Sequence, residues 1–126
     1  MIILKASFDD RQPIFLQIAE MIEDDIINHT YEIDDQVMST TAFAKTFQIN
    51  PATAVKGINL LVEEGILFKR RGLGMFVAEG AVEKILKKRR DSFYSQYVQK
   101  MLNEAKKINL TTDDVIELIK NGKRSE

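Results

Sequence analysis

The sequence predicts a mainly α-helical fold with one small β-hairpin, and three patterns along the chain indicate it. Apolar residues recur at helical spacing over residues 13–29 and again over residues 49–65. Two short apolar runs follow, separated by a basic turn that contains glycine, which is the pattern of a hairpin. A further stretch with helical spacing begins near residue 81. We therefore expect a helix-turn-helix with an adjoining hairpin over residues 1–79 and a C-terminal helical hairpin over residues 80–126.

Length and composition indicate an ordinary soluble protein. The 126 residues, 44% of them hydrophobic, suffice for one domain with or without a small appendage. The absence of cysteine excludes disulfides, thiolate nucleophiles and cysteine-based zinc sites, and it suits a reducing compartment. No apolar run approaches the roughly 20 residues of a membrane span, and Met1–Lys5 is too short for a signal peptide. We expect a cytoplasmic protein that does not bind a membrane.

The first predicted helix, from Pro13 to about His29, has the character of a scaffold. Its apolar residues form one stripe. Its acidic residues, which are expected mostly away from that stripe, are Glu20, Glu23, Asp24 and Asp25. So many acids argue against phosphate contact except at the helix N-terminus. The preceding run Ile2–Leu4 is a candidate edge strand, to which we assign no function.

A short second helix is predicted from Ser39 to about Phe47. Ser39 is a suitable N-cap, and apolar residues on the helix would pack it against the next one. Ser39, Thr40 and Thr41 also bring hydroxyls and free backbone N–H groups to a helix start, where they can hold a phosphate. Capping alone explains Ser39 equally well, so both interpretations stay open.

The third predicted helix lies between Asn50 and Gly65. Asn50 is a favourable N-cap, Pro51 suits the first helical position, and Gly65 fits the position after the helix. The apolar face expected to be buried consists of Ala54, Val55, Ile58, Leu61 and Val62. The small or polar residues near the N-terminal end are Ala52, Thr53, Lys56 and Gly57. Such an end suits a helix that reads base edges in the major groove of double-stranded DNA. We therefore expect Thr53, Lys56 and the residues around Asn50 to contact bases.

The hairpin is predicted from two apolar runs, Ile66–Phe68 and Met75–Ala78, joined by a basic, glycine-containing turn. Three adjacent cations near its tip can track phosphates or enter a minor groove. A basic run of this length is usually only a solvated loop, so its significance comes from the two helices before it. The hairpin residues that we expect to contact DNA are Lys69, Arg70, Arg71, Gly72 and Gly74.

The charge distribution supports this interpretation, although the net charge of −1 at first argues against DNA. Residues 45–90 hold ten Lys or Arg against four Glu, a balance of +6, whereas residues 1–35 carry −7. The positive segment coincides with the third helix, the hairpin and the start of the following helix. This segregation is expected of a chain with one face toward DNA.

The segment Pro13–Ala78, about half of the chain, resembles the winged helix-turn-helix DNA-binding domain of the GntR family of bacterial transcription regulators. PIFLQIAEMIEDDI resembles the family's opening helix, INPATAVKGINLLVEEGIL its recognition helix and RRGLGMFVA its wing. The run Asn50-Pro51-x-Thr53 and the short tail are similar to the YtrA-like subfamily. The resemblance implies a sequence-specific DNA-binding transcription regulator, most often a repressor.

The sequence departs from the family pattern at two positions. Thr41 stands where the family usually has an arginine in the second helix, and Pro51 replaces the usual arginine just after the cap of the recognition helix. The arginine that Thr41 replaces often touches DNA in the resembled family. The operator preference of better-known members therefore does not transfer to this chain.

The C-terminal region is predicted to be a long helix from Ala81 and a short helix from Thr111 through Ile119, closed by Gly122. An apolar stripe runs along the long helix, and two helices alone cannot cover that much apolar surface. We expect a homodimer whose interface contains Val82, Ile85, Leu86, Phe93, Tyr97, Met101, Ala105 and Ile108. About 47 residues are too few to enclose a large effector cavity, which leaves only groove or dimer-interface binding for a small-molecule effector.

Other classes of function find little support in the sequence. His29 is the only histidine and is expected at the surface, which argues against a metal ligand or a catalytic base. The side chains of adjacent aspartates diverge, so they do not form a carboxylate pair for acid–base chemistry. Gly72-x-Gly74 leads into a strand, whereas a phosphate-binding glycine motif leads into a helix. We therefore expect no enzyme, metal or cofactor. Two alternatives to a regulator stay open: a winged-helix adaptor in plasmid replication or partition, and a protein-interaction module that does not bind DNA.

Overall fold

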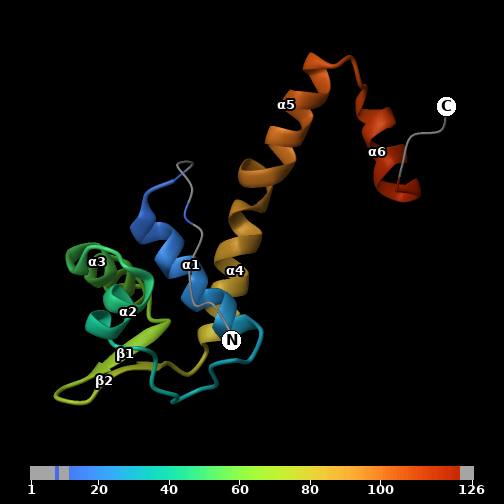
Figure 1. Ribbon diagram of the computed structural model, residues 1–126. Helices are drawn as coiled ribbons and strands as arrows, with labels where there is room; N and C mark the ends of the chain where they lie inside the picture. Colours follow the sequence, from blue (N-terminus) through green and yellow to red (C-terminus); the bar gives the residue numbers. More distant parts are fainter. Residues whose placement is uncertain (1–7, 9–11, 123–126) are drawn as a thin grey trace. The chain divides into compact units, whose positions relative to one another are not determined.

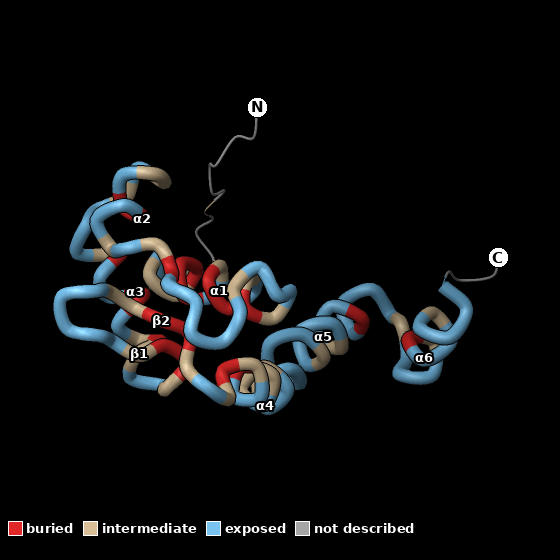
Figure 2. The backbone as a smooth tube through the Cα atoms, turned by 90° about the horizontal axis from the view of Figure 1, so that it is seen from below, coloured by how far each residue is buried: buried red, intermediate tan, exposed pale blue. Residues whose placement is uncertain are grey.

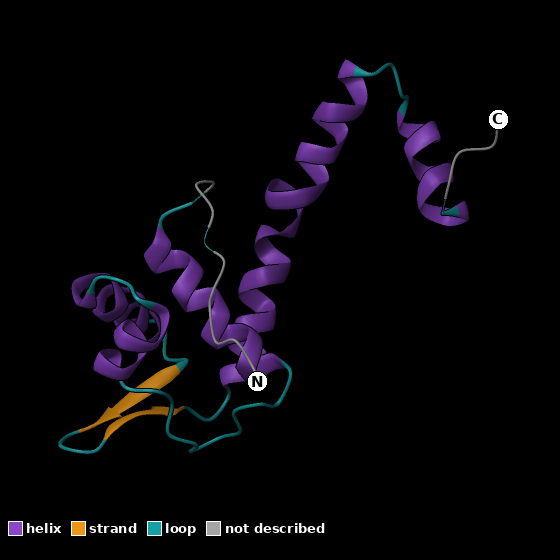
Figure 3. Ribbon diagram, in the orientation of Figure 1, coloured by secondary structure: helices purple, strands orange, loops and turns teal. Residues whose placement is uncertain are grey.

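The computed structural model describes Phe8 and residues 12–122, and it is mainly helical (Figure 1, Figure 3). In chain order the elements are α1 (Ile14–Ile27), α2 (Thr40–Phe47), α3 (Pro51–Glu63), β1 (Leu67–Arg70), β2 (Gly74–Val77), α4 (Ala81–Phe93), the π-helical turn η1 (Tyr94–Val98), α5 (Gln99–Lys107) and α6 (Thr112–Asn121). The two strands form one antiparallel sheet, so the predicted fold class is confirmed. The candidate strand Ile2–Leu4 lies outside the described residues.

The chain divides into two compact units, one that ends at Leu86 and one that begins at Lys87. This division falls within α4 and later than the expected boundary after residue 79. The reason is that Ala81 and Ile85 from the start of α4 are buried in the core of the first unit, where Ile85 is 0% exposed. Each unit is best understood by itself.

The core of the first unit draws on every one of its elements. Its buried residues, red in Figure 2, are Ile18, Ala19, Ile22, Ile26, Val37, Phe43, Ala44, Ala54, Ile58, Leu61, Ile66, Leu67, Val77, Ala81 and Ile85. Burial of this many apolar side chains is the main force that holds three short helices and a hairpin together. Isolated helices of this length would be marginal in water.

Helix α1 supplies one side of this core but differs from its prediction at Glu23. This carboxylate was expected on the polar side of the helix, yet the residue is 2% exposed. Glu23 follows the buried Ala19 by one helical turn, so both residues lie on one face. The buried face is therefore wider than the apolar stripe, whereas Ile14 in the first turn is exposed.

Helix α3 packs against α1 at a glycine. A Cβ atom added at Gly57 would lie 2.7 Å from the backbone oxygen of Phe15 and 3.0 Å from Cγ2 of Ile18. The interpretation of Gly57 as a small residue facing DNA was therefore wrong: it is buried and permits the close approach of two helices. Val55 also differs from prediction, because it is exposed instead of belonging to the buried face.

The hairpin pairs Leu67 with Val77 and Arg70 with Gly74, which leaves residues 71–73 as the turn. Phe68 and Phe76 stack across the strands with ring centroids 5.8 Å apart. The segment before α2, residues 34–37, lies along the other edge of β2. Its hydrogen bonds run from the Val37 amide to Met75 O and from the Val77 amide to Asp35 O, at 2.9 Å each. This segment covers a sheet edge that would otherwise be open.

In the second unit, the prediction for α6 is confirmed in detail. The Thr111 hydroxyl accepts the Asp114 amide N–H at 3.1 Å, and the Asp114 carboxylate accepts the Thr111 amide N–H at 2.9 Å. This reciprocal pair is a capping box, and Gly122 closes the helix at φ 75°. The long helix predicted from Ala81 is instead interrupted by the π-helical turn η1.

The residues of the predicted dimerisation stripe fall into two groups, those that pack within the chain and those that are exposed. Ile85 is a core residue of the first unit, Val82 packs against that core, and Ala105 is 5% exposed within the second unit. Ile85 and Ala105 are covered by the chain itself and are not available to a partner, whereas Val82 is partly covered. The large apolar side chains exposed on the second unit are Phe93, Tyr94, Tyr97, Met101, Ile108, Ile116 and Ile119.

Candidate nucleic-acid interface

The start of α2 presents hydroxyl groups at the surface. The Ser39 Oγ accepts the Ala42 amide N–H at 3.0 Å, which confirms that Ser39 caps the helix. Thr40 is half-buried and Thr41 is exposed. Because the first amides of a helix lack intrahelical acceptors, this end can still accept an anion beside the capped position.

The start of α3 is equally well defined. The Asn50 Oδ1 accepts the Ala52 amide N–H at 2.8 Å, and Pro51 occupies the first helical position, so both predictions are confirmed. Pro51 and Ala52 are exposed, whereas Thr53 is half-buried. Farther along the same exposed side of the helix lie Val55, Lys56, Asn59 and Glu63.

Lys56, the one cation of α3, does not extend straight into solvent. Its Nζ lies 4.1 Å from the centroid of the Phe15 ring in α1, which is a cation–π contact. The side chain is nevertheless exposed, so the ammonium group remains accessible from the surface. The contact limits the directions in which Lys56 points and holds it toward the α1 side of the helix.

The hairpin holds one of its three cations on aromatic rings. The Arg70 guanidinium carbon lies 5.2 Å from the Phe68 ring centroid and 4.8 Å from that of Phe76. Lys69 and Arg71 are exposed. Arg70 is therefore more restricted than its two neighbours, because a planar guanidinium stacked on rings loses much of its freedom.

Two glycines shape the hairpin tip. Gly72 has φ 77° and no atom lies within 4 Å of a Cβ built on it, so its conformation, and not crowding, favours glycine. Gly74 has φ 126°, and a Cβ there would lie 2.7 Å from Nε2 of Gln36. That amide nitrogen donates to Leu73 O at 2.6 Å, which fastens the turn to the segment before α2.

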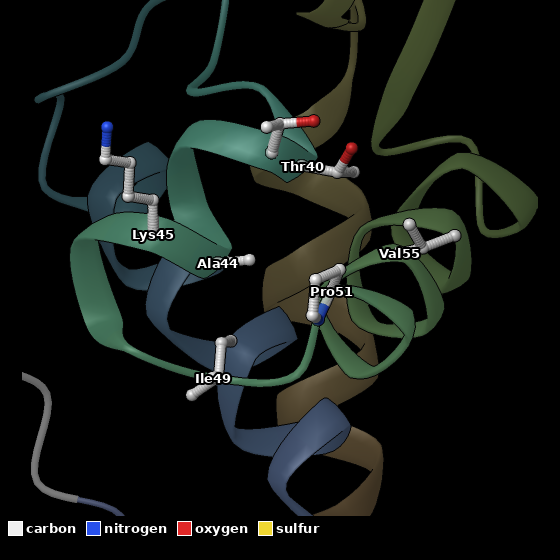
Figure 4. Close-up of a pocket in the computed structure, with 7 residues that line it drawn as sticks. Thr40, Ala44, Lys45, Ile49, Pro51 and Val55 are labelled. Carbon is white, nitrogen blue, oxygen red and sulfur yellow. The ribbon is translucent and has the colours of Figure 1, made fainter.

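A pocket of about 320 Å³ opens between α2 and α3 (Figure 4). Its lining residues are Thr40, Thr41, Ala44, Lys45, Ile49, Pro51 and Val55. Sequence reasoning missed this pocket and four of these residues: Ala44, Lys45, Ile49 and Val55. The position of Val55 in the helix could have revealed the pocket. Val55 lies one turn after Pro51, on the same side of α3, and roughly a quarter turn away from the buried Ala54.

Other candidate sites carry less chemistry. His29 is exposed, as predicted, with Nδ1 3.4 Å from a Glu32 carboxylate oxygen. Among the described residues no group of three His, Cys, Asp or Glu could hold a metal ion, and none of their helices is long and apolar enough to cross a membrane. Burial and the neighbouring Asp24 raise the pKa of Asp25, and the hydrogen bond that Lys87 donates to the Asp91 carboxylate raises the pKa of Lys87. Neither group lies on α2, α3 or the hairpin.

Comparisons with known protein sequences identify regulators. No protein-family model matches the chain. The HTH-type transcriptional regulator YhcF of Bacillus subtilis is 28% identical over 113 residues, which cover 90% of this chain and 92% of YhcF. The HTH-type transcriptional repressor NagR of the same organism is 32% identical over 74 residues, which are 59% of this chain but only 30% of NagR. The expectation that the chain is not an enzyme agrees with these relatives.

Solved structures extend the similarity to the fold. A GntR family transcriptional regulator from Listeria monocytogenes is 26% identical with a TM-score of 0.69, over 90% of this chain and 97% of that one. The DNA-binding domain of AraR, solved in complex with operator ORX1, is 26% identical with a TM-score of 0.53, over 57% of this chain and 93% of that one. With its winged helix and a helical C-terminal region, the chain is similar in sequence and fold to GntR family transcriptional regulators.

Proposed function

We propose that the chain is a cytoplasmic, sequence-specific DNA-binding transcription regulator that acts as a homodimeric repressor on an inverted-repeat operator. One observation carries this proposal: the exposed N-terminal half of α3, the open start of α2 and the cationic hairpin belong to one compact unit. The solved AraR domain, similar to this unit, was captured on its operator. The repressor role is proposed by analogy with NagR, an HTH-type transcriptional repressor.

Within this function the residues divide by task. Thr53, Lys56 and the residues around Asn50 would read base edges, because the first turns of a recognition helix enter the major groove. The hairpin residues Arg70, Arg71 and Gly72 would contact phosphates or the minor groove. The start of α2, with Ser39, Thr40 and Thr41, would hold a backbone phosphate. Lys69 and Gly74 complete the proposed surface on the hairpin.

The second unit would supply the dimer interface. Two of its helices expose large apolar side chains, and exposed apolar patches of this kind mark protein contacts. The residues of the predicted stripe that are exposed on the second unit are Phe93, Tyr97, Met101 and Ile108. Two-fold symmetry would then impose half-sites about one helical turn, or a multiple of it, apart on the operator.

An effector, if the protein has one, would bind at the dimer interface or in a groove of the second unit. A pocket of about 350 Å³ lies between α5 and α6 and has mainly apolar walls. Met101, Ile108, Val115 and Ile119 are among its lining residues. Because Met101 and Ile108 also belong to the proposed interface, a ligand there would compete with or remodel the dimer.

Repeated selection of duplexes from a random-sequence library, followed by gel shifts, tests the proposed function. We expect enrichment of an inverted repeat that the protein binds at least about a thousandfold more tightly than random DNA. Enrichment of a single, asymmetric half-site would contradict the dimeric arrangement. No binding to any duplex at low salt would contradict the function itself and favour a protein-interaction module.

A further inference from the structure

We propose that the pocket between α2 and α3 receives the 5-methyl group of a thymine in each operator half-site. This inference rests on the proposed function and adds a base preference to it. The pocket lies between the first turns of the two helices that would approach the major groove, and Pro51 and Val55 of α3 form one of its walls (Figure 4).

The exposed side of α3 indicates which kind of base contact to expect. Over its first two turns the exposed residues are Pro51, Ala52, Val55 and Lys56. Three of these four side chains have no hydrogen-bonding group, and the ammonium group of Lys56 lies over the Phe15 ring. On the α2 side of the helix, the side chains available for direct readout are therefore apolar.

Because the C-terminal end of α3 is acidic, its N-terminal half is the part that approaches DNA. Glu63 and Glu64 at the C-terminal end are exposed, and carboxylates there would repel phosphates. The N-terminal half carries no acid, and its free amides favour negative charge. The pocket thus lies beside the part of the helix that has the more favourable electrostatics.

The chemistry of the base edges then selects the occupant. In the major groove the 5-methyl group of thymine is the apolar feature that distinguishes the base pairs, and small apolar side chains contact it. The pocket's apolar side chains, Ala44, Ile49, Pro51 and Val55, offer such a methyl group an apolar wall to contact. The remaining lining residues, Thr40, Thr41 and Lys45, suit the adjacent phosphate backbone.

Single-position replacement of thymine by uracil in the selected duplex tests the proposal, since it removes only the methyl group. We expect one position in each half-site where uracil lowers the affinity about fourfold, as for loss of one buried methyl group. Replacing that base by 5-methylcytosine, with guanine opposite, keeps the methyl group but changes the base pair. The affinity that remains shows how much of the preference for thymine is due to the methyl group. Uracil at the other positions should change the affinity less than twofold.

The variant Val55→Ala determines whether the pocket is responsible. Val55 is 39% exposed, so its truncation should leave the fold intact. We expect Val55→Ala to weaken binding to the thymine duplex several-fold and to abolish the difference between thymine and uracil at the sensitive position, because coupled contacts are not additive. Val55→Thr, which replaces a methyl group by a hydroxyl, should reduce the difference as well. The matched control Ile33→Ala, at an exposed apolar residue outside the pocket, should keep the full difference.

The possible results separate this inference from the proposed function. If a sequence is enriched but uracil has no effect at any position, or if its effect persists in Val55→Ala, the methyl pocket is refuted while the regulator stands. If no sequence is enriched, the proposed function fails and the base preference falls with it. A thymine effect that disappears only in the Val55 variants supports the proposal.

Discussion

The two units of the chain use apolar side chains in opposite ways. In the first unit many large aliphatic residues are inside, and Ile18, Ile58, Leu61 and Ile85 are each 0% exposed. In the second unit only the small or medium residues Ala105 and Val115 are buried among those described, whereas aromatic side chains face outward. The first unit therefore has an apolar core of its own, whereas the second exposes the apolar surface that we propose as the dimer interface.

The largest expected effect concerns where the first unit ends. A chain truncated after Glu79 loses Ala81 and Ile85 from the core, and the loss of a buried isoleucine alone costs about 2–5 kcal/mol. We expect this truncated chain to unfold without a clear cooperative transition. A chain truncated after Leu86 should unfold cooperatively and sediment as a monomer that binds DNA weakly.

Urea denaturation followed by circular dichroism, together with analytical ultracentrifugation, compares the two truncated chains. Equal stability of both would show that α4 is not part of the first unit. If the chain that ends at Leu86 were still a dimer, the dimer interface would lie outside the C-terminal helices.

The second prediction compares one isoleucine from each unit. Ile58→Ala should lower the free energy of unfolding by about 2–5 kcal/mol, because Ile58 is 0% exposed in the core. Ile116→Ala, at a residue 43% exposed on α6, should change the stability of the monomer by less than about 0.5 kcal/mol. Denaturant titrations at a concentration low enough to keep the protein monomeric measure both. Similar losses in the two variants would remove the contrast between the units.

The third prediction addresses the close contact between α1 and α3. Gly57→Ala should destabilise the first unit by about 1–2 kcal/mol, because the added methyl group meets the Phe15 backbone and this outweighs the gain in helix propensity. Asn59→Ala, at an exposed position of the same helix, should be neutral or slightly stabilising. Thermal unfolding of both variants gives the answer. Stabilisation by Gly57→Ala would mean that the two helices separate easily.

The smallest effect is expected at the end of α3, where Nζ of Lys84 donates to Gly65 O at 3.1 Å. A cation near the C-terminus of a helix contributes about 0.3–1 kcal/mol, and this contact is exposed. Lys84→Met keeps the aliphatic stem and removes the charge, so we expect a loss within that range that shrinks at high salt. A loss that is independent of salt would assign the effect to packing instead.

Local features of the fold could be predicted from the sequence, since their causes lie within a few residues. Ser39, Asn50 and Thr111 cap helices as predicted, because each side chain reaches an amide two or three residues away. Gly65 and Gly122 end helices for a similarly local reason, their positive φ angles. The alternation of apolar and basic runs likewise sufficed to predict the hairpin.

What could not be predicted depends on packing between elements distant in sequence. Helical spacing gave no indication that Gly57 meets α1 or that Ile85 completes the first core, since an apolar stripe looks the same whether a partner or the chain itself covers it. The pocket at Val55 was missed for the same reason. The residues of the candidate DNA surface stay a prediction, and the apolar pocket within that surface is visible only once α2 and α3 are placed together.

In the proposed function, α3 specifies the DNA sequence whereas the hairpin mainly positions the protein. Affinities of Lys56→Ala and Arg71→Ala for the selected duplex and for random DNA, measured across several salt concentrations, test it most directly. Lys56→Ala should weaken binding to the selected duplex by about 1–3 kcal/mol with little effect on random DNA, and Arg71→Ala should weaken both and lower the salt slope by about one. Equal losses on both duplexes for Lys56→Ala, with an unchanged salt slope for Arg71→Ala, would contradict the account.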